Sequence, residues 1–459
     1  MAKRNKRFPS VPRPTSLPTI FLDRARELLG DEFARFEQAL ADTPPVSIRL
    51  NPAKSGGPVG DPIPWCSTGR YLHQRPVFTL DPMLHAGAYY VQEASSMLLE
   101  QALRASNMLD RPILALDLCA SPGGKTTLLR SLLHPDSLVV ANEVERKRQA
   151  ALQENLWKWG AANVVVTGSD PADLAHLPET FDLIQVDAPC SGEGLFRKDP
   201  FARTQWSDAL VVQCATTQRR IVEQAWHALR PGGMLIYSTC TWETLENEDR
   251  LDQLAELGAL GVDLPLDADW VVVPVGTSGI AGYRCYPHRV RGEGFFLAAV
   301  RKAGVAAVNG VGSEQLDDHP EQRRWLASPS RWHFEQHAGV LHSVDDRWTG
   351  VLRELQRCLR VLAPGRPVAE QHAGVWRPHA ALALDTSIRR GAFPEVPLDR
   401  PAALGYLQGA ALPATDATGH ALAVHEGLPI GWLKGAGSRW NNLWPAPWRI
   451  RMHIPAGEA

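Results

Sequence analysis

Short apolar runs alternate with amphipathic stretches through the middle of the chain. The strand candidates are residues 113–118, 137–144, 163–170, 181–190, 229–240 (which opens with a helix end and a tight turn) and 294–302. The helix candidates are residues 145–158, 210–229 and 244–259. Strands that alternate with helices predict a parallel, doubly wound α/β sheet, which binds ligands at the carboxyl ends of its strands.

The patterns on either side of this region are different. Residues 18–41 have apolar positions three and four apart, which predicts a helix, and residues 47–52 form a short strand candidate. Residues 394–459 are rich in Pro, Gly and Trp, with strand candidates at 421–425 and 429–434. We therefore expect five segments: an N-terminal extension (1–110), a core (111–302), a linker (303–330), an intermediate region (331–393) and a β-rich module (394–459).

Composition and charge narrow the class of protein. The 459 residues are 44% hydrophobic and 21% charged, which excludes a wholly disordered or collagen-like chain. Net charge is −2, so the chain is not a polybasic coat for nucleic acid. Residues 1–14 carry five basic residues and no acidic one; a solvated tail is favoured over an arm that contacts phosphates. No apolar run reaches the roughly 18 residues of a membrane helix. We expect a cytoplasmic protein without membrane contact.

The first motif that carries chemistry is LDLCASPGGKTT (116–127), a glycine turn between a strand and a helix. A P-loop would need a glycine where Cys119 stands, and a dinucleotide fingerprint would need G-x-G-x-x-G, which is absent. A loop for the amino-acid and ribose part of an adenosyl ligand remains. The alternative is a plain turn from strand to helix.

Two acidic residues end the next two strand candidates. Glu143 can accept hydrogen bonds from both hydroxyls of a ribose, and Asp170 can accept one from the amino group of adenine. Each has a structural alternative. Glu143 is equally consistent with a capping or exposed residue, and Asp170 with a helix N-cap, because Pro171 follows it directly.

Cys190 and Cys240 end two successive strand candidates, in the motifs DAPCSGEGLFRKDP (187–200) and YSTCTWETLENED (237–249). A single buried cysteine is normally a small hydrophobic residue, and we interpret Cys66, Cys214, Cys285 and Cys358 in this way. Two thiols at neighbouring strand ends, beside a cofactor loop, indicate thiolate catalysis more than metal binding, since no C-x-x-C spacing is present. We predict no metal site.

A thiolate beside a methyl donor suits methylation of cytosine at C5. That carbon is a weak nucleophile until a thiolate adds to C6 and turns C5 into an enamine carbon. C5 then attacks the sulfonium methyl. A base removes the C5 proton, and the thiolate is eliminated. A carboxylate such as Asp187, near N3 and N4, would stabilise the activated base, and a second thiol could help release the adduct.

The motifs DLCASPGGKT, NEVERKR, VDAPCSGEG and YSTCT, in this order, resemble those of the Sun-type RNA 5-methylcytosine methyltransferases. The resemblance covers about residues 15–302. It implies a class I (Rossmann-like) methyltransferase sheet with an N-terminal α+β extension, and S-adenosyl-L-methionine as cofactor. It implies that Cys240 is the nucleophile and Cys190 the releasing thiol. The cofactor-binding residues that it implies are Cys119, Ala120, Ser121, Pro122, Gly123, Gly124, Lys125, Glu143, Asp170 and Asp187. The resemblance also implies that Asp187 faces the cytosine as well as the cofactor.

The C-terminal stretch 427–451 resembles the PUA-like module of the bacterial F-type small-subunit rRNA cytosine methyltransferases, which implies 16S rRNA or the small ribosomal subunit as partner. This stretch contains four tryptophans: Trp432, Trp440, Trp444 and Trp448. For these side chains, packing in a core is favoured over stacking with RNA bases. The segment is net basic, with one acid against four cations, which suits contact with phosphates. The charged residues are Glu426, Lys434, Arg439, Arg449 and Arg451.

We therefore expect a monomeric RNA cytosine-C5 methyltransferase. The alternatives are another RNA target, tRNA or a different rRNA, and a non-catalytic RNA-binding assembly factor that has kept the fold. The second alternative is disfavoured because both thiols and the whole cofactor segment are present.

Overall fold

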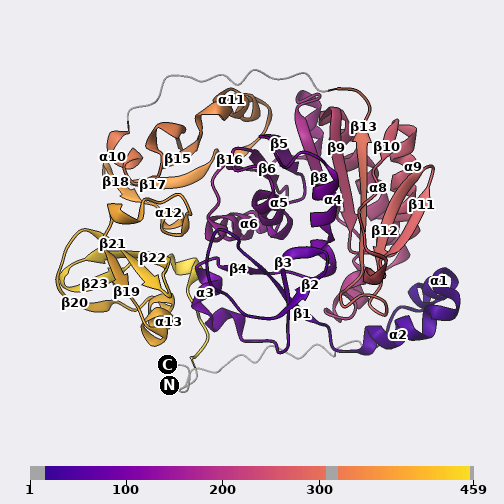
Figure 1. Cartoon of the computed structure of the whole chain (residues 1–459), viewed down its shortest axis with the longest axis horizontal. Helices are drawn as coiled ribbons and strands as arrows, with labels where there is room; N and C mark the ends of the chain where they lie inside the picture. The colour runs from indigo at the N-terminus through magenta and orange to yellow at the C-terminus, as the bar shows by residue number, and fades with distance from the viewer. Residues whose placement is uncertain (1–15, 306–318, 455–459) are drawn as a thin grey trace, which may run out of the picture.

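A computed structural model describes residues 16–305 and 319–454, and a large sheet lies at its centre (Figure 1). The parallel strands of this sheet follow the order β9-β8-β5-β6-β7. They are β9 (Leu229–Thr239), β8 (Phe181–Asp187), β5 (Leu114–Asp117), β6 (Leu138–Asn142) and β7 (Val164–Thr167). Their side chains are buried on both faces, which explains why the strands appear as continuous apolar runs. The α/β doubly wound prediction is confirmed.

The outer strands on the β9 side differ from the prediction. Strand β13 (Phe295–Lys302) runs antiparallel to β9, so a wholly parallel sheet is wrong. Beyond it lie β12 (Ile280–Cys285) and β11 (Val273–Thr277), while β10 (Ala259–Gly261) pairs with β13. The predicted helix 244–259 is shorter: η6 (Thr244–Glu246) precedes α9 (Glu248–Glu256), and the chain then turns at Gly258, whose φ is +80°, into β10.

Helices cover the faces of this sheet. They include α5 (Gly124–Leu132), α6 (Arg146–Trp159) and α8 (Asp208–Ala228). Because α5 and α6 follow β5 and β6 directly, their N-termini lie at the carboxyl edge of the sheet, where the sequence analysis expects the ligand.

The N-terminal extension combines helices with a small antiparallel sheet. The predicted helix 18–41 is two helices, α1 (Thr19–Leu29) and α2 (Phe33–Ala41), separated by η1 (Gly30–Glu32), because Gly30 has φ +52°. The sheet has the order β2-β3-β1-β4. Its strands are β2 (Asp61–Ile63), β3 (Cys66–Leu72), β1 (Val46–Leu50) and β4 (Tyr89–Val91), with α3 (Pro82–His85) and α4 (Leu99–Ala105) around it. The basic tail 1–14 lies outside the described residues.

The intermediate region forms its own sheet, β14-β15-β17-β18, and also joins the core. Its strands are β14 (Trp332–His337), β15 (Val340–Asp345), β17 (Arg366–His372) and β18 (Val375–Pro378), with α11 (Thr349–Cys358) and α12 (Ala380–Leu384); α10 (Pro320–Arg323) precedes it, in the predicted linker. Strand β16 (Val361–Ala363) leaves this sheet and pairs antiparallel with β7 at the edge of the central sheet. Leu352, Leu355 and Val361 share one apolar cluster with the core strands.

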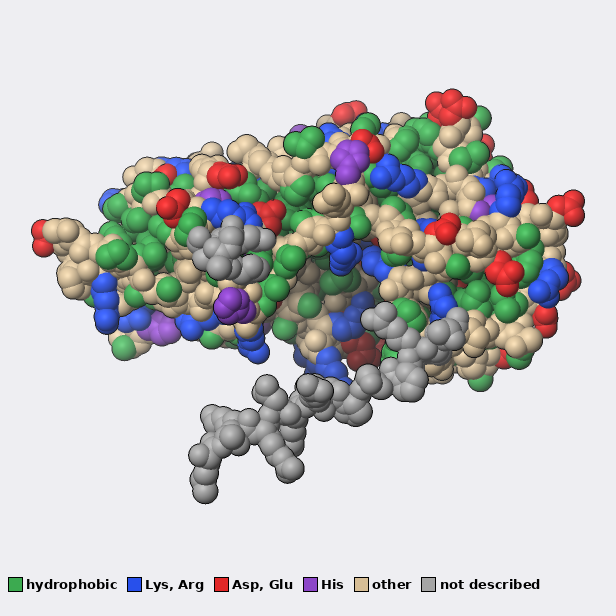
Figure 2. All heavy atoms as spheres, turned by 90° about the horizontal axis from the view of Figure 1, so that it is seen from below, with side chains coloured by type: hydrophobic (Ala, Val, Ile, Leu, Met, Phe, Trp, Pro, Cys, Tyr) green, Lys and Arg blue, Asp and Glu red, His purple; other side chains and the backbone are tan. Residues whose placement is uncertain are grey.

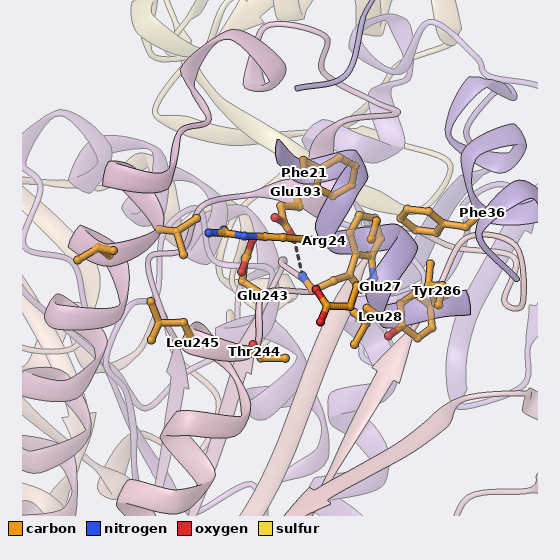
Figure 3. Close-up of a pocket in the computed structure, with 15 residues that line it drawn as sticks. Phe21, Arg24, Glu27, Leu28, Phe36, Glu193, Glu243, Thr244, Leu245 and Tyr286 are labelled. Atoms are coloured by element: carbon orange, nitrogen blue, oxygen red, sulfur yellow. Dashed lines mark hydrogen bonds and ion pairs between the residues drawn. The ribbon is translucent and has the colours of Figure 1, made fainter. Parts of the chain in front are cut away.

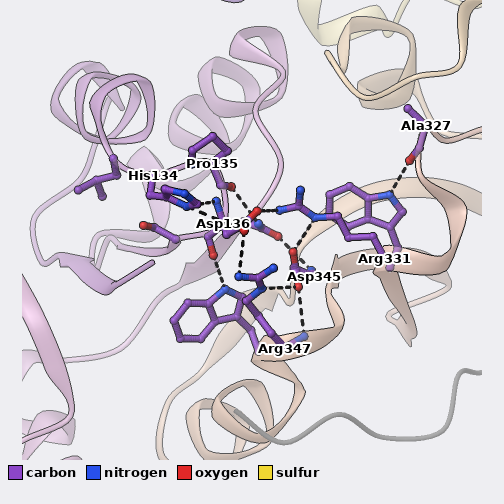
Figure 4. A network of polar contacts seen from close by, with 12 residues as sticks. His134, Pro135, Asp136, Ala327, Arg331, Asp345 and Arg347 are labelled. Atoms are coloured by element: carbon purple, nitrogen blue, oxygen red, sulfur yellow. Dashed lines mark hydrogen bonds and ion pairs between the residues drawn. The ribbon is translucent and has the colours of Figure 1, made fainter. Parts of the chain in front are cut away.

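A polar network fixes the intermediate region to the core (Figure 4). Asp136, in the loop before β6, forms ion pairs with Arg331 and Arg347, and both arginines also pair with Asp345. The indole Nε1 of Trp348 donates to the backbone oxygen of Asp136 at 2.8 Å. Two carboxylates against two guanidinium groups leave this contact balanced in charge.

The C-terminal module is a sheet of order β19-β21-β22-β23-β20 with α13 (Arg400–Gln408) against it. Its strands are β19 (Glu395–Pro397), β21 (His420–His425), β22 (Leu428–Gly435), β23 (Gly437–Asn442) and β20 (Leu412–Ala417). Trp432 and Trp444 are 1% and 2% exposed, so core packing is their role, whereas Trp440 and Trp448 are half-buried. Within the described residues, no helix combines the length and apolarity that crossing a membrane requires.

Candidate active site at the carboxyl ends of the strands

The structure brings the two predicted cysteines together. Cys190 follows β8, Cys240 follows β9, and their Sγ atoms lie 3.2 Å apart as free thiols. The backbone N–H of Cys240 also donates to the Cys190 Sγ at 3.4 Å. The pKa of the Cys190 thiol lies well above its usual range, because it is hydrogen-bonded to Cys240, buried, and near the charge of Glu246. The protonated form of Cys190 is therefore favoured, next to the Cys240 sulfur.

Two buried carboxyl groups hold the loops that carry these cysteines. Glu193, after Cys190, accepts hydrogen bonds from the Thr241 hydroxyl at 2.9 Å and the Trp242 backbone N–H at 3.0 Å, both after Cys240. Glu246 accepts from the Ser191 backbone N–H at 3.0 Å. Burial raises the pKa of both carboxyl groups. The acids therefore lock the two strand ends to each other, a role that the sequence analysis missed.

Gly194 allows the same two loops to approach closely. Its backbone N–H donates to the Cys240 carbonyl at 2.8 Å. A Cβ atom at this position would lie 2.4 Å from the Gly294 oxygen and 2.8 Å from the Cys240 oxygen. Since both neighbours are backbone atoms, only glycine fits without displacing the Cys240 loop.

Asp187 ends β8 next to the cysteines and pairs with the predicted cofactor loop. Its Oδ2 lies 2.7 Å from the Nζ of Lys125, in the first turn of α5, and its Oδ1 accepts from the Ser238 hydroxyl at 3.0 Å. Burial opposes the charge of Lys125, but the contact with the Asp187 carboxylate outweighs burial, with smaller contributions from the nearby Cys240 and Asp117, and the pKa of Lys125 is raised. A fixed cation therefore lies within the electrostatic reach of the Cys240 sulfur.

The predicted cofactor segment forms the turn between β5 and α5. Cys119 to Gly123 make the loop, and Gly124 and Lys125 open the helix. Gly123 has φ +111°, in the region that favours glycine. Ala120 and Ser121 bind the neighbouring β6–α6 segment: the Ala120 N–H donates to the Asn142 oxygen at 2.8 Å, and the Ser121 hydroxyl donates to the Arg148 oxygen at 3.2 Å.

Residues of the N-terminal extension form hydrogen bonds with this turn and with the start of α5. Arg49, in β1, is fully buried and donates to the Gly124 oxygen and the Thr127 hydroxyl in the first turn of α5. The Tyr90 hydroxyl donates to the Pro122 oxygen at 3.3 Å. At Gly124 a Cβ atom would lie 3.3 Å from the Tyr90 ring, so the loop and the extension are in close contact.

Asp117 is a further residue whose role the sequence did not predict. It ends β5, is fully buried, and accepts from the Thr126 hydroxyl at 2.6 Å through Oδ2, while its Oδ1 has no hydrogen-bond partner. Burial raises its pKa to about 7. The signal was present in the sequence: an acid inside the apolar run 113–118 lies directly before the glycine turn. An orphaned buried acceptor here suits a ligand that carries donors or a positive charge.

Glu143 and Asp170 lie at the ends of β6 and after β7, at the same edge. The Glu143 carboxylate is buried, accepts from the Glu145 N–H at 2.8 Å, and lies 3.5 Å from Arg148. Asp170 is exposed and accepts from the Ala172 N–H at 2.9 Å, which is the N-cap contact of η4 (Pro171–His176). Asp170 therefore makes the N-cap contact expected for it, whereas Glu143 is neither exposed nor the N-cap of α6, which is Glu145. Both carboxylates keep oxygen capacity for a ligand.

The remaining cysteines lie apart from this pair. Cys66, Cys214 and Cys285 are buried, as predicted. Cys358 differs: it is only half-buried, at the end of α11, and its Sγ lies 3.7 Å from the His176 oxygen. Among the described residues, no cluster of three or more His, Cys, Asp or Glu side chains could hold a metal ion.

A cavity of about 560 Å³ lies behind the Cys240 loop, between α1 and residues 242–245 (Figure 3). Arg24 reaches across it from α1 to the Glu243 carboxylate at 2.8 Å. Phe21, Phe36 and Trp242 pack in the same place. The cavity thus lies where the N-terminal helices pack against the residues that follow Cys240.

Comparison with protein families gives three matches that together span most of the chain. The model described as 16S rRNA methyltransferase RsmB/F matches residues 108–301. The N-terminal domain of 16S rRNA methyltransferase RsmF matches residues 17–94, and the Methyltransferase RsmF PUA domain matches residues 393–450.

Individual relatives agree with these matches. Ribosomal RNA small subunit methyltransferase F of Erwinia tasmaniensis is 32% identical over 93% of this chain and 96% of its own length. The protein of the same name from Pectobacterium atrosepticum is 37% identical, with 63% of this chain matched to 64% of that relative's length.

Solved structures show the same core. A methyltransferase homologue from Pyrococcus horikoshii has a TM-score of 0.52 and 29% identity, covering 62% of this chain and 94% of that one. NSun6 from the same organism, solved with SFG, has a TM-score of 0.51 at 19% identity, covering 63% and 99%, and supports the fold alone.

Proposed function

The chain belongs to the 16S rRNA methyltransferase RsmB/F family, and from that premise we propose that it methylates C5 of a cytosine in RNA through a covalent Cys240 adduct. The observation that carries the proposal is the contact of two free thiols at adjacent strand ends, 3.2 Å apart, beside the glycine turn. A methyltransferase that acted on a stronger nucleophile would need neither thiol.

The edge of the sheet fits S-adenosyl-L-methionine, which supplies a methyl group on a positively charged sulfur when it is bound. The glycine turn leaves its backbone accessible, and Glu143 presents its carboxylate for the ribose hydroxyls. The unpartnered Oδ1 of Asp117 and the carboxylates of Asp187 and Asp170 make this edge acidic, which suits a cationic ligand.

Each group near the cysteines has a defined task in this proposal. The Cys240 thiolate adds to C6 of the cytosine, and C5 becomes nucleophilic. The Lys125 ammonium pairs with Asp187 and holds its carboxylate in place, so that it can hydrogen-bond the amino side of the base. After methyl transfer a base removes the C5 proton, and the C6–S bond breaks. Cys190, which holds its proton beside Cys240, assists that release.

RNA, and 16S rRNA in particular, is the proposed substrate. Support comes from the names of the relatives and from the PUA-type module at the C-terminus. On the face seen in Figure 2, Lys and Arg side chains gather along a hollow, a surface that suits a phosphate backbone. Two alternatives to this proposal are tested below: methylation of another RNA, and RNA binding without catalysis.

Methyl transfer to defined RNAs tests this proposal. The purified protein is incubated with methyl-labelled S-adenosyl-L-methionine and with 16S rRNA, assembled small subunits, 23S rRNA or tRNA, followed by bisulfite mapping. We expect label in 16S rRNA or in the small subunit, at a cytosine protected from bisulfite conversion. Label at another atom, or in tRNA alone, would overturn the assignment of chemistry or substrate. Catalytically inactive protein that still binds 16S rRNA would favour the assembly factor.

A further inference from the structure

The intermediate region contributes an arginine to the edge of the sheet where the cofactor is proposed to bind. Arg360 lies between α11 and β16, directly before the strand that pairs with β7. Its backbone is bonded on both sides: the Gly168 N–H donates to the Arg360 oxygen at 2.9 Å, and the Arg360 N–H donates to the Ser169 hydroxyl at 2.7 Å. These two residues separate the end of β7 from Asp170.

The guanidinium of Arg360 lies directly over this strand end. Its Nε donates to the Gly168 oxygen at 3.0 Å. A Cβ atom at Gly168 would lie 2.4 Å from the Arg360 Nη2 and 2.6 Å from the Gln149 Nε2, so both side chains converge on this glycine. Gln149 in turn donates to the backbone oxygen of Glu143 at 2.7 Å. Arg360 is therefore a neighbour of the residue proposed to hold the ribose.

A buried amide fixes the three strand ends that surround this point. Asn142, at the end of β6, donates to the Leu118 oxygen at 3.2 Å and to the Ser169 oxygen at 3.1 Å. Its own oxygen accepts from the Thr167 hydroxyl at 2.8 Å. Since Leu118 opens the glycine turn and Ser169 binds Arg360, the ends of β5, β6 and β7 and the Arg360 backbone form one connected network.

The guanidinium of Arg360 has more hydrogen-bond donors than these contacts use. It is exposed, and no carboxylate contacts its guanidinium among the residues that the structure describes. Val144, directly after Glu143, offers an exposed apolar side chain at the same edge, 46% accessible. An arginine plane and an apolar side chain are groups against which a purine ring packs.

We propose that Arg360 binds the adenine of S-adenosyl-L-methionine, so that the intermediate region completes the cofactor site. The proposal rests on the proposed function, because the position of the adenine follows from Glu143 holding the ribose. From Glu143 on β6, the adenine extends toward β7, where Gly168, Asp170 and Arg360 lie. The planar guanidinium packs on the ring or donates to its nitrogens.

Calorimetric titration of three ligands tests the role of Arg360. The ligands are S-adenosylhomocysteine, adenosine, and S-ribosylhomocysteine, which lacks the adenine. Arg360→Ala removes the guanidinium but keeps both backbone bonds. We expect about tenfold weaker binding of the two adenine ligands and unchanged binding of the third. Arg360→Lys, which keeps the charge but loses the plane, should recover only part of the loss.

Arg357→Ala is the matched control, because Arg357 is also exposed, at the end of α11, and its Nε donates to the Arg353 oxygen. It should bind all three ligands like the parent. Equal weakening of all three ligands by Arg360→Ala would mean a purely structural effect and overturn the proposal. Unchanged cofactor affinity with weaker RNA binding would assign the arginine to a phosphate instead. If the parent itself binds no S-adenosylhomocysteine, the proposed function fails, independently of Arg360.

Discussion

Gly194→Ala should destabilise the protein and reduce catalysis through one added methyl group. The φ angle at this position lies outside the glycine region, so the effect is steric. The new Cβ would lie 2.4 Å from the Gly294 oxygen and 2.8 Å from the Cys240 oxygen. Both are backbone atoms of packed segments and cannot rotate away. Overpacking of this kind costs about 1–3 kcal/mol, and two backbone contacts place the expected cost near 3 kcal/mol.

Urea titration measures the free energy of unfolding, and steady-state kinetics measures kcat for methyl transfer. Because the clash displaces the Cys240 loop, kcat should fall while the affinity for S-adenosyl-L-methionine stays unchanged. Gly350→Ala is the control: this glycine is exposed near the start of α11 with nothing within 4 Å of its Cβ position, so stability should stay equal or rise by up to about 1 kcal/mol. A Gly194→Ala variant with parental stability and kcat would refute the reasoning.

Three further outcomes follow from the cofactor edge and the C-terminal module. Glu143→Ala should weaken S-adenosyl-L-methionine binding at least about tenfold in calorimetry, because two charge-assisted hydrogen bonds to the ribose are removed; parental affinity would reject the ribose assignment. The pKa of Asp117 is raised to about 7 by burial, so the folded state keeps a proton that the unfolded state releases between about pH 4 and 7. Its contribution to stability therefore falls as pH rises, and Asp117→Asn should flatten the decline of unfolding free energy between pH 5 and 7; an unchanged slope would contradict the buried titration. The double variant Lys434→Ala/Arg439→Ala should bind RNA with a weaker salt dependence. The slope of the logarithm of the binding constant against the logarithm of the salt concentration should fall by about one unit for each phosphate that these two cations neutralise in the parent. An unchanged slope would exclude the module from the RNA interface.

The sequence predicted those parts of the fold whose signals are local. The strands β5 to β9 are buried on both faces, so each appears as a continuous apolar run, and the residues that follow them could be assigned to one edge. That is why the sequence places Cys190 and Cys240 together. The hairpin β11–β12 escaped prediction because β11 alternates only between exposed and half-buried positions. The three residues of β16 are too few to give a pattern.

The site residues that the sequence did not predict have their roles through contacts between distant parts of the chain. Glu193 matters because it binds residues 48 and 49 positions away, and Arg49 because its guanidinium meets the first turn of α5. No local spacing encodes such partners. The five-segment division stays a prediction. The C-terminal module also packs on the extension, with Leu80 and Ala86 in one apolar cluster with Trp444, a contact that composition does not predict.

Trapping of the covalent adduct is the most direct test of the central claim, because the two thiols have different tasks at 3.2 Å from each other. Protein and 16S rRNA are incubated with S-adenosyl-L-methionine and separated on a denaturing gel. Cys190→Ala should accumulate a protein–RNA band that survives denaturation, because release is impaired. Cys240→Ala should form no band and transfer no methyl group. A band from Cys240→Ala and none from Cys190→Ala would reverse the roles, and full activity of both variants would contradict covalent catalysis altogether.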